Sequence, residues 1–209
     1  MRLQMMGGEF CGNATMSFGA WLCRRAPIGQ TCRLALKISG APALVECSIT
    51  PLDGCFLGTV DMPLPEKIET LRLPLGSETA ELSVVRLPGI NHIIVPAQVL
   101  TRVRAEELIR RWAEVLHADA LGILLLQEEE LCYVTQTDTA VWERGCGSGS
   151  AAIGAYLTKK HGAPQCVSIR QPGGAIAVTT RCAEDGALSS LTISGTVLLG
   201  RSKKADVTL

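Results

Sequence analysis

Two cysteines stand in closely similar sequence contexts, 135 residues apart (146 − 11). Cys11 opens the segment CGNATMSFGAWLCRR, and Cys146 opens the segment CGSGSAAIGAYLTKK. The leading Cys-Gly, a later Gly-Ala and a Leu are identical, and the Thr/Ser, Phe/Ile, Trp/Tyr and Arg/Lys exchanges are conservative. Chance would give about one or two identities over such a length, so the chain contains an internal duplication.

Each segment is typical of a turn that leads into a helix. Apolar residues such as Phe18 and Leu22 recur at helical spacing, and basic residues close the last turn. A Cys-Gly pair would therefore stand at the N-terminus of each helix, where backbone N–H groups favour a thiolate and bind anions such as carboxylates. If a pseudo-twofold axis relates the two segments, we expect two thiols to flank one anion site.

Composition excludes several other classes of function. The formal net charge is zero and 47% of the residues are hydrophobic, which favours a packed core and gives no electrostatic case for binding nucleic acid. No apolar run reaches membrane-spanning length, and the first residues lack the layout of a signal peptide. We therefore expect a cytoplasmic protein that contacts neither nucleic acid nor membrane.

The nine cysteines contain no CxxC pair, so neither a zinc ribbon nor a thioredoxin motif is indicated, and no metal site is expected. Reduced thiols are expected in the cytoplasm. Seven cysteines lie among apolar or strand-like neighbours and are interpreted as small buried apolar side chains. These are Cys23, Cys32, Cys47, Cys55, Cys132, Cys166 and Cys182.

The elements that must position Cys11 and Cys146 also occur twice. Each helix is followed by three strands separated by turns: 33–39, 43–50 and 55–62 after the first, and 166–170, 175–181 and 189–194 after the second. Before Cys146 the pattern predicts strands 82–87, 92–95, 122–126 and 131–136 and an amphipathic helix 105–116. Only ten residues precede Cys11, so we expect the first half to lack on the order of sixty residues.

The motifs GGEFCGNAT and CGSGSAA resemble those of the diaminopimelate epimerase superfamily of cofactor-independent amino acid racemases. The segments Pro88–His92 and Leu191–Gly195 are similar to the middle motif and closing strands of that family. The resemblance implies that Cys11 and Cys146 are the catalytic pair and that His92 partners the first cysteine. It also implies that Gly12, Asn13, Gly147 and Ser148 hold the substrate carboxylate.

The sequence departs from the diaminopimelate epimerases where they recognise the distal end of their substrate. Ile90 and Asn91 occupy the centre of the middle motif, and Glu143 and Arg144 lie only three and two residues before Cys146. We interpret Asn91, Glu143 and Arg144 as candidate substrate-binding residues, although the last two could equally form an exposed turn. The GGEFCGNA form is more similar to the histidine racemases of opine-type metallophore pathways.

Inverting an amino acid α-carbon requires removal of a proton from one face and delivery of a proton to the other. Two thiols on opposite faces can exchange these roles, and helix N-termini can stabilise the carbanion through its carboxylate. We therefore predict an isomerase, an amino acid racemase or epimerase that uses no pyridoxal phosphate or other cofactor. Two alternatives remain: a non-catalytic amino acid-binding protein or inactive remnant, and a redox protein in which Cys11 and Cys146 form a disulfide.

The predicted fold is α/β (α+β), with two pseudo-symmetric halves. Each half is a curved, mostly antiparallel sheet wrapped around a central helix, and the active site lies in the cleft between them. We place the incomplete N-terminal half at residues 1–65, the C-terminal half at 66–195, and a closing strand that returns to the N-terminal half at 196–209. The expected partner is a small amino acid, and exposed sheet edges would favour a homodimer.

Overall fold

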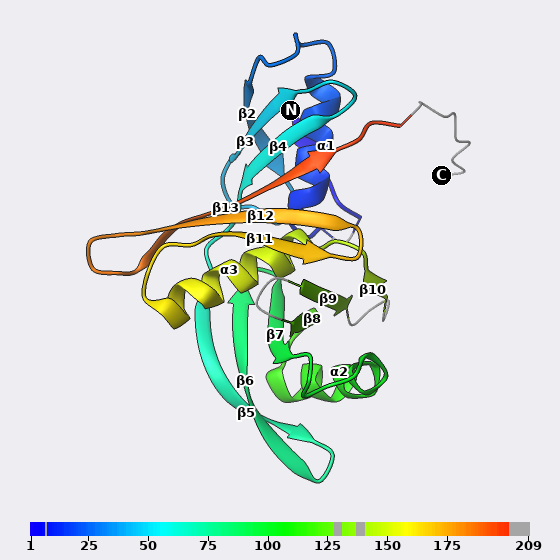
Figure 1. Cartoon of the computed structure of the whole chain (residues 1–209), viewed down its shortest axis with the longest axis vertical. Helices are drawn as coiled ribbons and strands as arrows, with labels where there is room; N and C mark the ends of the chain where they lie inside the picture. The colour runs from blue at the N-terminus through cyan, green and yellow to red at the C-terminus, as the bar shows by residue number, and fades with distance from the viewer. Residues whose placement is uncertain (7, 128–130, 137–140, 201–209) are drawn as a thin grey trace.

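A computed structural model describes residues 1–6, 8–127, 131–136 and 141–200, with only the backbone described for 131–136. The described chain forms two lobes stacked along the long axis of the molecule (Figure 1). In the described part of the first lobe, helix α1 (Gly12–Leu22) lies against four strands. These strands are β1 (Arg2–Leu3), β2 (Cys32–Ile38), β3 (Val45–Pro51) and β4 (Phe56–Asp61).

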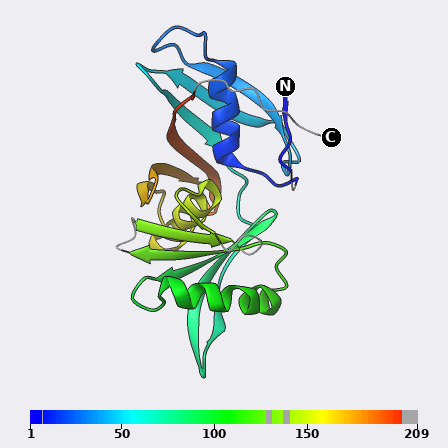
Figure 2. The ribbon, with the colours of Figure 1, turned by 90° about the vertical axis from the view of Figure 1, so that its right-hand side faces the viewer.

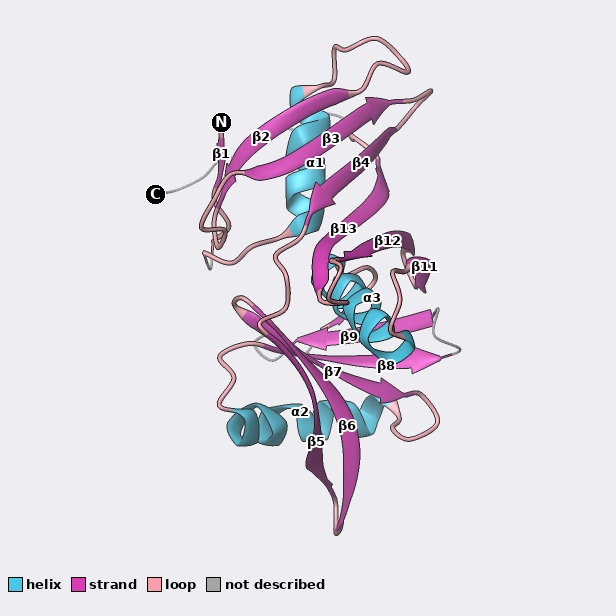
Figure 3. Cartoon of the chain, turned by 90° about the vertical axis from the view of Figure 1, so that its left-hand side faces the viewer, coloured by secondary structure: helices cyan, strands magenta, loops and turns pink. Residues whose placement is uncertain are grey.

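The second lobe is larger and contains two helices, α2 (Arg102–Leu116) and α3 (Gly147–His161). Its strands are β5 (Lys67–Leu75), β6 (Glu78–Leu87), β7 (Ile90–Pro96), β8 (Leu121–Gln127), β9 (Leu131–Gln136), β10 (Trp142–Glu143), β11 (Cys166–Gln171), β12 (Gly174–Cys182) and β13 (Leu188–Val197). Figure 3 shows α2 and α3 on opposite faces of the sheet formed by β5 to β9.

One pair of strands connects the sheets of the two lobes. The strand order is β1-β2-β3-β4-β13-β12-β11-β9-β8-β7-β6-β5, with β10 paired to β9. The connection is the antiparallel pairing of β4 with β13, from Thr192–Asp61 to Val197–Phe56. Within it Thr59 and Ser194 lie directly opposite each other, and their hydroxyls are 2.7 Å apart. These two residues are 135 positions apart, the same offset as Cys11 and Cys146.

The sheet connection therefore lies on the axis that relates the two sequence copies. β4 and β13 are the third strands of their copies, and they pair antiparallel through equivalent residues. The hairpins β2–β3 and β11–β12 occupy corresponding places on either side. Figure 2 shows the two lobes one above the other, with α1 lying along its strands. The predicted α+β fold with two pseudo-symmetric lobes is confirmed.

Two apolar clusters hold the molecule together. One is continuous across the lobes and includes Met16 and Ile49 of the first lobe with Ile153, Val178 and Ile193 of the second. The other lies beneath α2 and is centred on the fully buried Trp112. The amphipathic pattern predicted that helix correctly, because its apolar stripe packs against the sheet and its charged side faces out.

Several element boundaries differ from the sequence prediction. Helix α1 ends at Leu22, so Arg24 lies beyond it and stacks over the Trp21 ring at 4.2 Å. Strand β5 was not predicted, because Pro74 interrupts its pattern. Proline is tolerated there because β5 is the last strand of the sheet, and the Pro74 carbonyl accepts a hydrogen bond from Trp112 Nε1 at 2.8 Å.

Candidate active site

The two cysteines cap the two helices that the duplication predicts. Cys11 is the N-cap of α1 with φ −133° and ψ 107°, and Cys146 is the N-cap of α3 with φ −126° and ψ 116°. Each thiol sulfur accepts a hydrogen bond from the backbone N–H three residues on, Ala14 at 3.5 Å and Gly149 at 3.4 Å. A hydroxyl in each first turn, Thr15 or Ser150, donates to the carbonyl of the capping cysteine.

The N-termini of α1 and α3 converge at the junction of the lobes. A Cβ added to Gly12 or to Gly147 would come within 2.8 or 2.9 Å of the same atom, Ile193 Cδ1. Asn13 reaches across from the first lobe and donates from Nδ2 to the Gly145 carbonyl at 3.2 Å. The absence of a side chain at both glycines therefore lets the two helix ends approach one methyl group of β13, as a pseudo-twofold arrangement requires.

Cys146 is held by hydrogen bonds in addition to those of an ordinary helix N-cap. Its backbone N–H donates to Gln171 Oε1 at 2.6 Å, and Gln171 Nε2 donates to Ser150 Oγ at 2.7 Å. Ser150 in turn donates to the Cys146 carbonyl at 2.7 Å. These bonds form a closed ring of buried polar groups around the cap, which fixes the position of the thiol.

The electrostatic environment of Cys146 differs from the expectation for a helix N-terminus. Burial, with the nearby Glu143 carboxylate, raises the pKa of the Cys146 thiol to about 12. Hydrogen bonds from Ser148 and from the Gly149 N–H act in the opposite direction but do not outweigh burial. The free protein therefore holds Cys146 as a thiol. Cys11, in contrast, is half-buried.

His92 lies next to the second cysteine segment. The ring is fully buried, its Nε2 is 3.0 Å from Ser148 Oγ, and burial lowers the pKa of His92 to about 4. Its Nδ1 is buried without a hydrogen-bond partner in the described part of the chain. The family resemblance implies a partnership with the first cysteine, whereas the structure connects His92 to α3 through Ser148.

The structure does not bring every candidate residue to the same place. Asn91 precedes His92 in β7, so its side chain is directed to the opposite face of the sheet, where Ile93 and Val95 pack in the cluster beneath α2. Glu143 is near enough to Cys146 to raise its pKa. Arg144 is exposed, and its Nη2 lies 3.5 Å from the Pro172 carbonyl.

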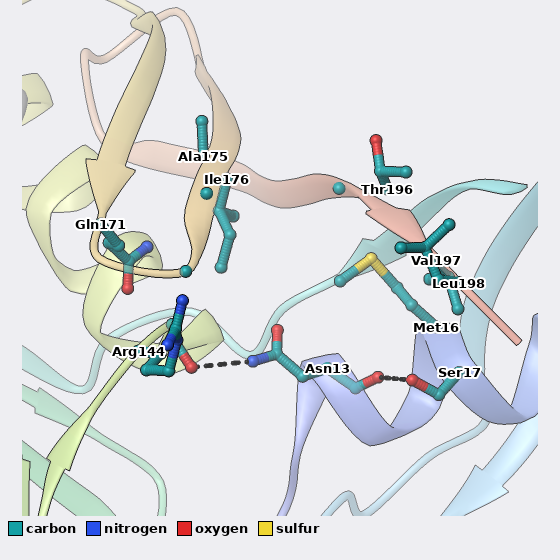
Figure 4. Close-up of a pocket in the computed structure, with 14 residues that line it drawn as sticks. Asn13, Met16, Ser17, Arg144, Gln171, Ala175, Ile176, Thr196, Val197 and Leu198 are labelled. Atoms are coloured by element: carbon teal, nitrogen blue, oxygen red, sulfur yellow. Dashed lines mark hydrogen bonds between the residues drawn. The ribbon is translucent and has the colours of Figure 1, made fainter. Parts of the chain in front are cut away.

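A cavity of about 410 Å³ lies between the lobes beside these helix ends (Figure 4). Asn13, Met16 and Ser17 of α1 line one side of it. Arg144 and Gln171 of the second lobe line the other. Asn13 and Gly145, which are joined by the hydrogen bond from Asn13 Nδ2, both line the cavity, so it lies next to the point where the two helices meet.

Three residues that position the site were not identified from the sequence: Gln171, Ser150 and Ile193. Gln171 ends a strand just before a Pro-Gly-Gly turn, and a polar residue at a strand end is a weak sequence signal by itself. Its burial, with 7% of the residue exposed, is seen only in the structure. Ile193 resembles any other strand residue. Ser150 has a recognisable signal, because it matches Thr15 in the repeat and both hydroxyls bond to the capping carbonyl.

Two general properties of the described residues bear on the site. They contain no group of three or more metal-ligating side chains placed to hold a metal ion. None of the helices among them has the length and apolarity needed to cross a membrane.

Solved structures share this two-lobed architecture. A predicted epimerase from Pseudomonas aeruginosa superposes with a TM-score of 0.59 at 15% identity, over 92% of this chain and 73% of that chain. A PhzF-family phenazine biosynthesis protein from Bacillus anthracis gives 0.62 at 13% identity, over 92% and 75%. Methylitaconate-delta-isomerase gives 0.58 at 13% identity, over 94% and 76%. The fold is therefore the two-lobed fold of these epimerase-like and PhzF-like proteins.

Sequence comparison is more specific than the fold. The family model described as the histidine racemase CntK N-terminal domain matches residues 1–204, and the chain belongs to that family. A histidine racemase of Staphylococcus aureus is 29% identical over 199 residues, covering 90% of this chain and 71% of the relative. A histidine racemase of Fusobacterium nucleatum is 29% identical over 184 residues, covering 82% and 68%.

Proposed function

We propose that this protein is an amino acid racemase that inverts the α-carbon with two thiols, Cys11 and Cys146, and that histidine is its substrate. The observation that supports this most directly is the convergence of two equivalent cysteine-capped helix N-termini on Ile193. Membership in the histidine racemase family supports the reaction class and the substrate. An inactive binding protein is not favoured by these relatives.

The carboxylate of the substrate binds between the helix ends in this proposal. The N–H groups of Gly12, Asn13, Gly147 and Ser148 lie in first helical turns, where no carbonyl of the same helix can accept them. Two such ends supply N–H donors and the positive ends of two helix dipoles to one anion. The same donors stabilise the negative charge that spreads into the carboxylate when the α-proton leaves.

The two thiols then act from opposite faces of the α-carbon. One sulfur, as thiolate, takes the α-proton, and the other, as thiol, delivers its proton to the carbanion. After one turnover the protonation states of Cys11 and Cys146 are exchanged, so the enantiomer now bound is processed in reverse. The raised pKa of Cys146 makes it the proton donor in the resting protein. No cofactor takes part in these proton transfers.

The cavity between the lobes accommodates the imidazole side chain in this proposal. It lies beside the helix ends and offers the carboxamide of Asn13 and the hydroxyl of Ser17. Such groups can donate to one ring nitrogen and accept from the other. A redox role is not favoured by the site, because a thiol whose pKa is raised by burial is a poor nucleophile for disulfide exchange.

The test is α-proton exchange in D₂O with L- and D-histidine, followed by NMR and by chiral analysis. Two bases predict that early product carries deuterium while the remaining substrate keeps its proton. Cys11→Ser and Cys146→Ser should each lower the rate of racemisation by about 10²- to 10⁴-fold. Cys55→Ser is the control, because this cysteine lies in the turn before β4.

Two results would contradict the proposal. Full racemisation by Cys146→Ser would exclude the two-thiol mechanism. Absence of exchange with every amino acid tested, in a reduced protein that still binds histidine, would favour a binding protein of the same fold.

A further inference from the structure

Ser148 lies between a buried histidine and the Cys146 thiol. Its Oγ is 3.0 Å from His92 Nε2 and 3.4 Å from Cys146 Sγ. His92 comes from β7, whereas Ser148 lies in the first turn of α3 and Cys146 is the N-cap of that helix. The three side chains therefore connect the sheet of the second lobe to the sulfur through one hydroxyl group.

The direction of these hydrogen bonds follows from the protonation of His92. The ring is neutral, since its burial lowers the pKa to about 4, so only one ring nitrogen carries a proton. Nδ1 is buried without a partner among the described residues. A buried N–H without a partner is rarer than an unpaired acceptor, so the proton resides on Nε2 and is donated to Ser148 Oγ.

Among the described residues, this arrangement leaves the Ser148 hydroxyl proton with one acceptor, the sulfur of Cys146. As a thiolate, the sulfur gains a second donor beside the Gly149 N–H. As a thiol, the sulfur accepts the same two bonds, so its own proton must point away from Ser148. One fixed set of bonds therefore serves both protonation states.

We infer that Ser148 is a positioning residue for Cys146: its hydroxyl, oriented by His92, directs the thiol proton and stabilises the thiolate. The inference rests on the proposed function for its role in the reaction. It differs from carboxylate binding, which uses the backbone N–H of Ser148 and would survive loss of the hydroxyl.

The equivalent position in α1 does something else. Asn13 corresponds to Ser148 in the repeat (148 − 13 = 135), and its side chain crosses to the Gly145 carbonyl. The sulfur of Cys11 receives its bond from the Ala14 N–H. The two copies have thus diverged in role at this position, whose side chain joins the lobes in α1 and contacts the thiol in α3.

The experiment measures the reactivity of Cys146 separately from racemisation. Trypsin releases Cys146 in peptide 145–159, which contains no other cysteine, so alkylation by iodoacetamide can be followed by mass spectrometry. Ser148→Ala should lower the alkylation rate of Cys146 at pH 9 by about tenfold, since the thiolate loses a hydrogen bond. Alkylation of Cys11 should not change and is the internal control; it is located by fragmentation of peptide 3–24, which also contains Cys23.

Racemisation provides the second readout. Ser148→Ala should lower kcat for histidine by about ten- to a hundredfold with little change in KM, because the backbone N–H remains. Ser148→Thr and Ser148→Val have nearly the same shape and differ in the hydroxyl. Thr should restore the reactivity of Cys146 and Val should not, which keeps the test valid even where Ala perturbs the fold.

The alkylation rate of Cys146 also depends on the titratable groups around the thiol. Glu143 of β10 and His92 of β7 are the described titratable groups that face this thiol and Ser148. Replacement of the ring by His92→Met should mimic Ser148→Ala in the alkylation assay. Unchanged Cys146 alkylation in both Ser148→Ala and Ser148→Val would overturn the inference. Because alkylation requires no turnover, this result is independent of whether the protein racemises histidine.

Discussion

The contact between Gly147 and Ile193 allows a sharp test of how closely the two helix ends approach each other. A Cβ on Gly147 would lie 2.9 Å from Ile193 Cδ1 and 3.1 Å from Asn13 Oδ1. Ordinary contacts between carbon atoms are about 3.5–4.0 Å, so Gly147→Ala forces the helix end away from β13. Overpacking of this kind costs about 1–3 kcal/mol.

Ile193→Val removes Cδ1, the atom that the new methyl group on residue 147 would contact too closely. Alone it leaves a small cavity and should lower the free energy of unfolding by about 0.5–1.5 kcal/mol. In the Gly147→Ala background the same change makes room for the new methyl group. The double variant should therefore be more stable than the sum of the single changes by about 1–2 kcal/mol.

Urea unfolding of the four proteins measures this coupling energy. Gly145→Ala is the matched control, since a Cβ at that position meets no atom within 4 Å and should couple weakly to Ile193→Val. Racemisation of histidine should follow the same order, with Gly147→Ala impaired and the double variant partly restored. Coupling below about 0.5 kcal/mol would refute the idea that Ile193 sets the separation of the helix ends.

Three further predictions concern buried polar groups. Gln171→Met should lower the free energy of unfolding by about 2–4 kcal/mol, because it leaves the Cys146 N–H unpaired and removes a donor to Ser150. The control Gln30→Met, at an exposed site, should cost less than about 0.5 kcal/mol. Equal costs for the two variants would contradict the role of Gln171 in fixing the Cys146 cap. Protonation of His92 is disfavoured in the folded state, so the free energy of unfolding should fall by roughly 3 kcal/mol as the pH drops from 6.5 to 4. His92→Gln should abolish that loss when unfolding is measured across this pH range. The raised pKa of Cys146 gives stability that is complete below pH 9 and declines as the pH rises towards 12, and Cys146→Ala should flatten this decline.

The sequence predicted those features of the site that repetition and local pattern encode. The duplicated Cys-Gly segments located both helix N-termini, and alternation predicted the strands that follow them. The partners of those segments depend on tertiary packing. Gln171 meets the Cys146 N–H because β11 passes the start of α3, and no local pattern specifies that approach.

The electrostatics of Cys146 show the same limit. A helix N-terminus alone favours the thiolate, but burial and Glu143 outweigh it, and burial is a property of the assembled lobes. Likewise, the strand that carries His92 was predicted, whereas its pairing with Ser148 follows from how α3 packs against the sheet.

The two sulfurs occupy equivalent caps yet differ in burial, since Cys146 is 4% exposed and Cys11 is half-buried. Free enantiomers have equal energies, so for a racemase the specificity constants in the two directions must be the same. The protein is not its own mirror image, however, and in the proposed mechanism each enantiomer releases its proton to a different thiol. The maximal rate and the half-saturating concentration can therefore both differ between the enantiomers, but the two quantities must differ by the same factor. In that mechanism the divergence of the two copies determines which enantiomer is held more tightly, without altering the position of equilibrium.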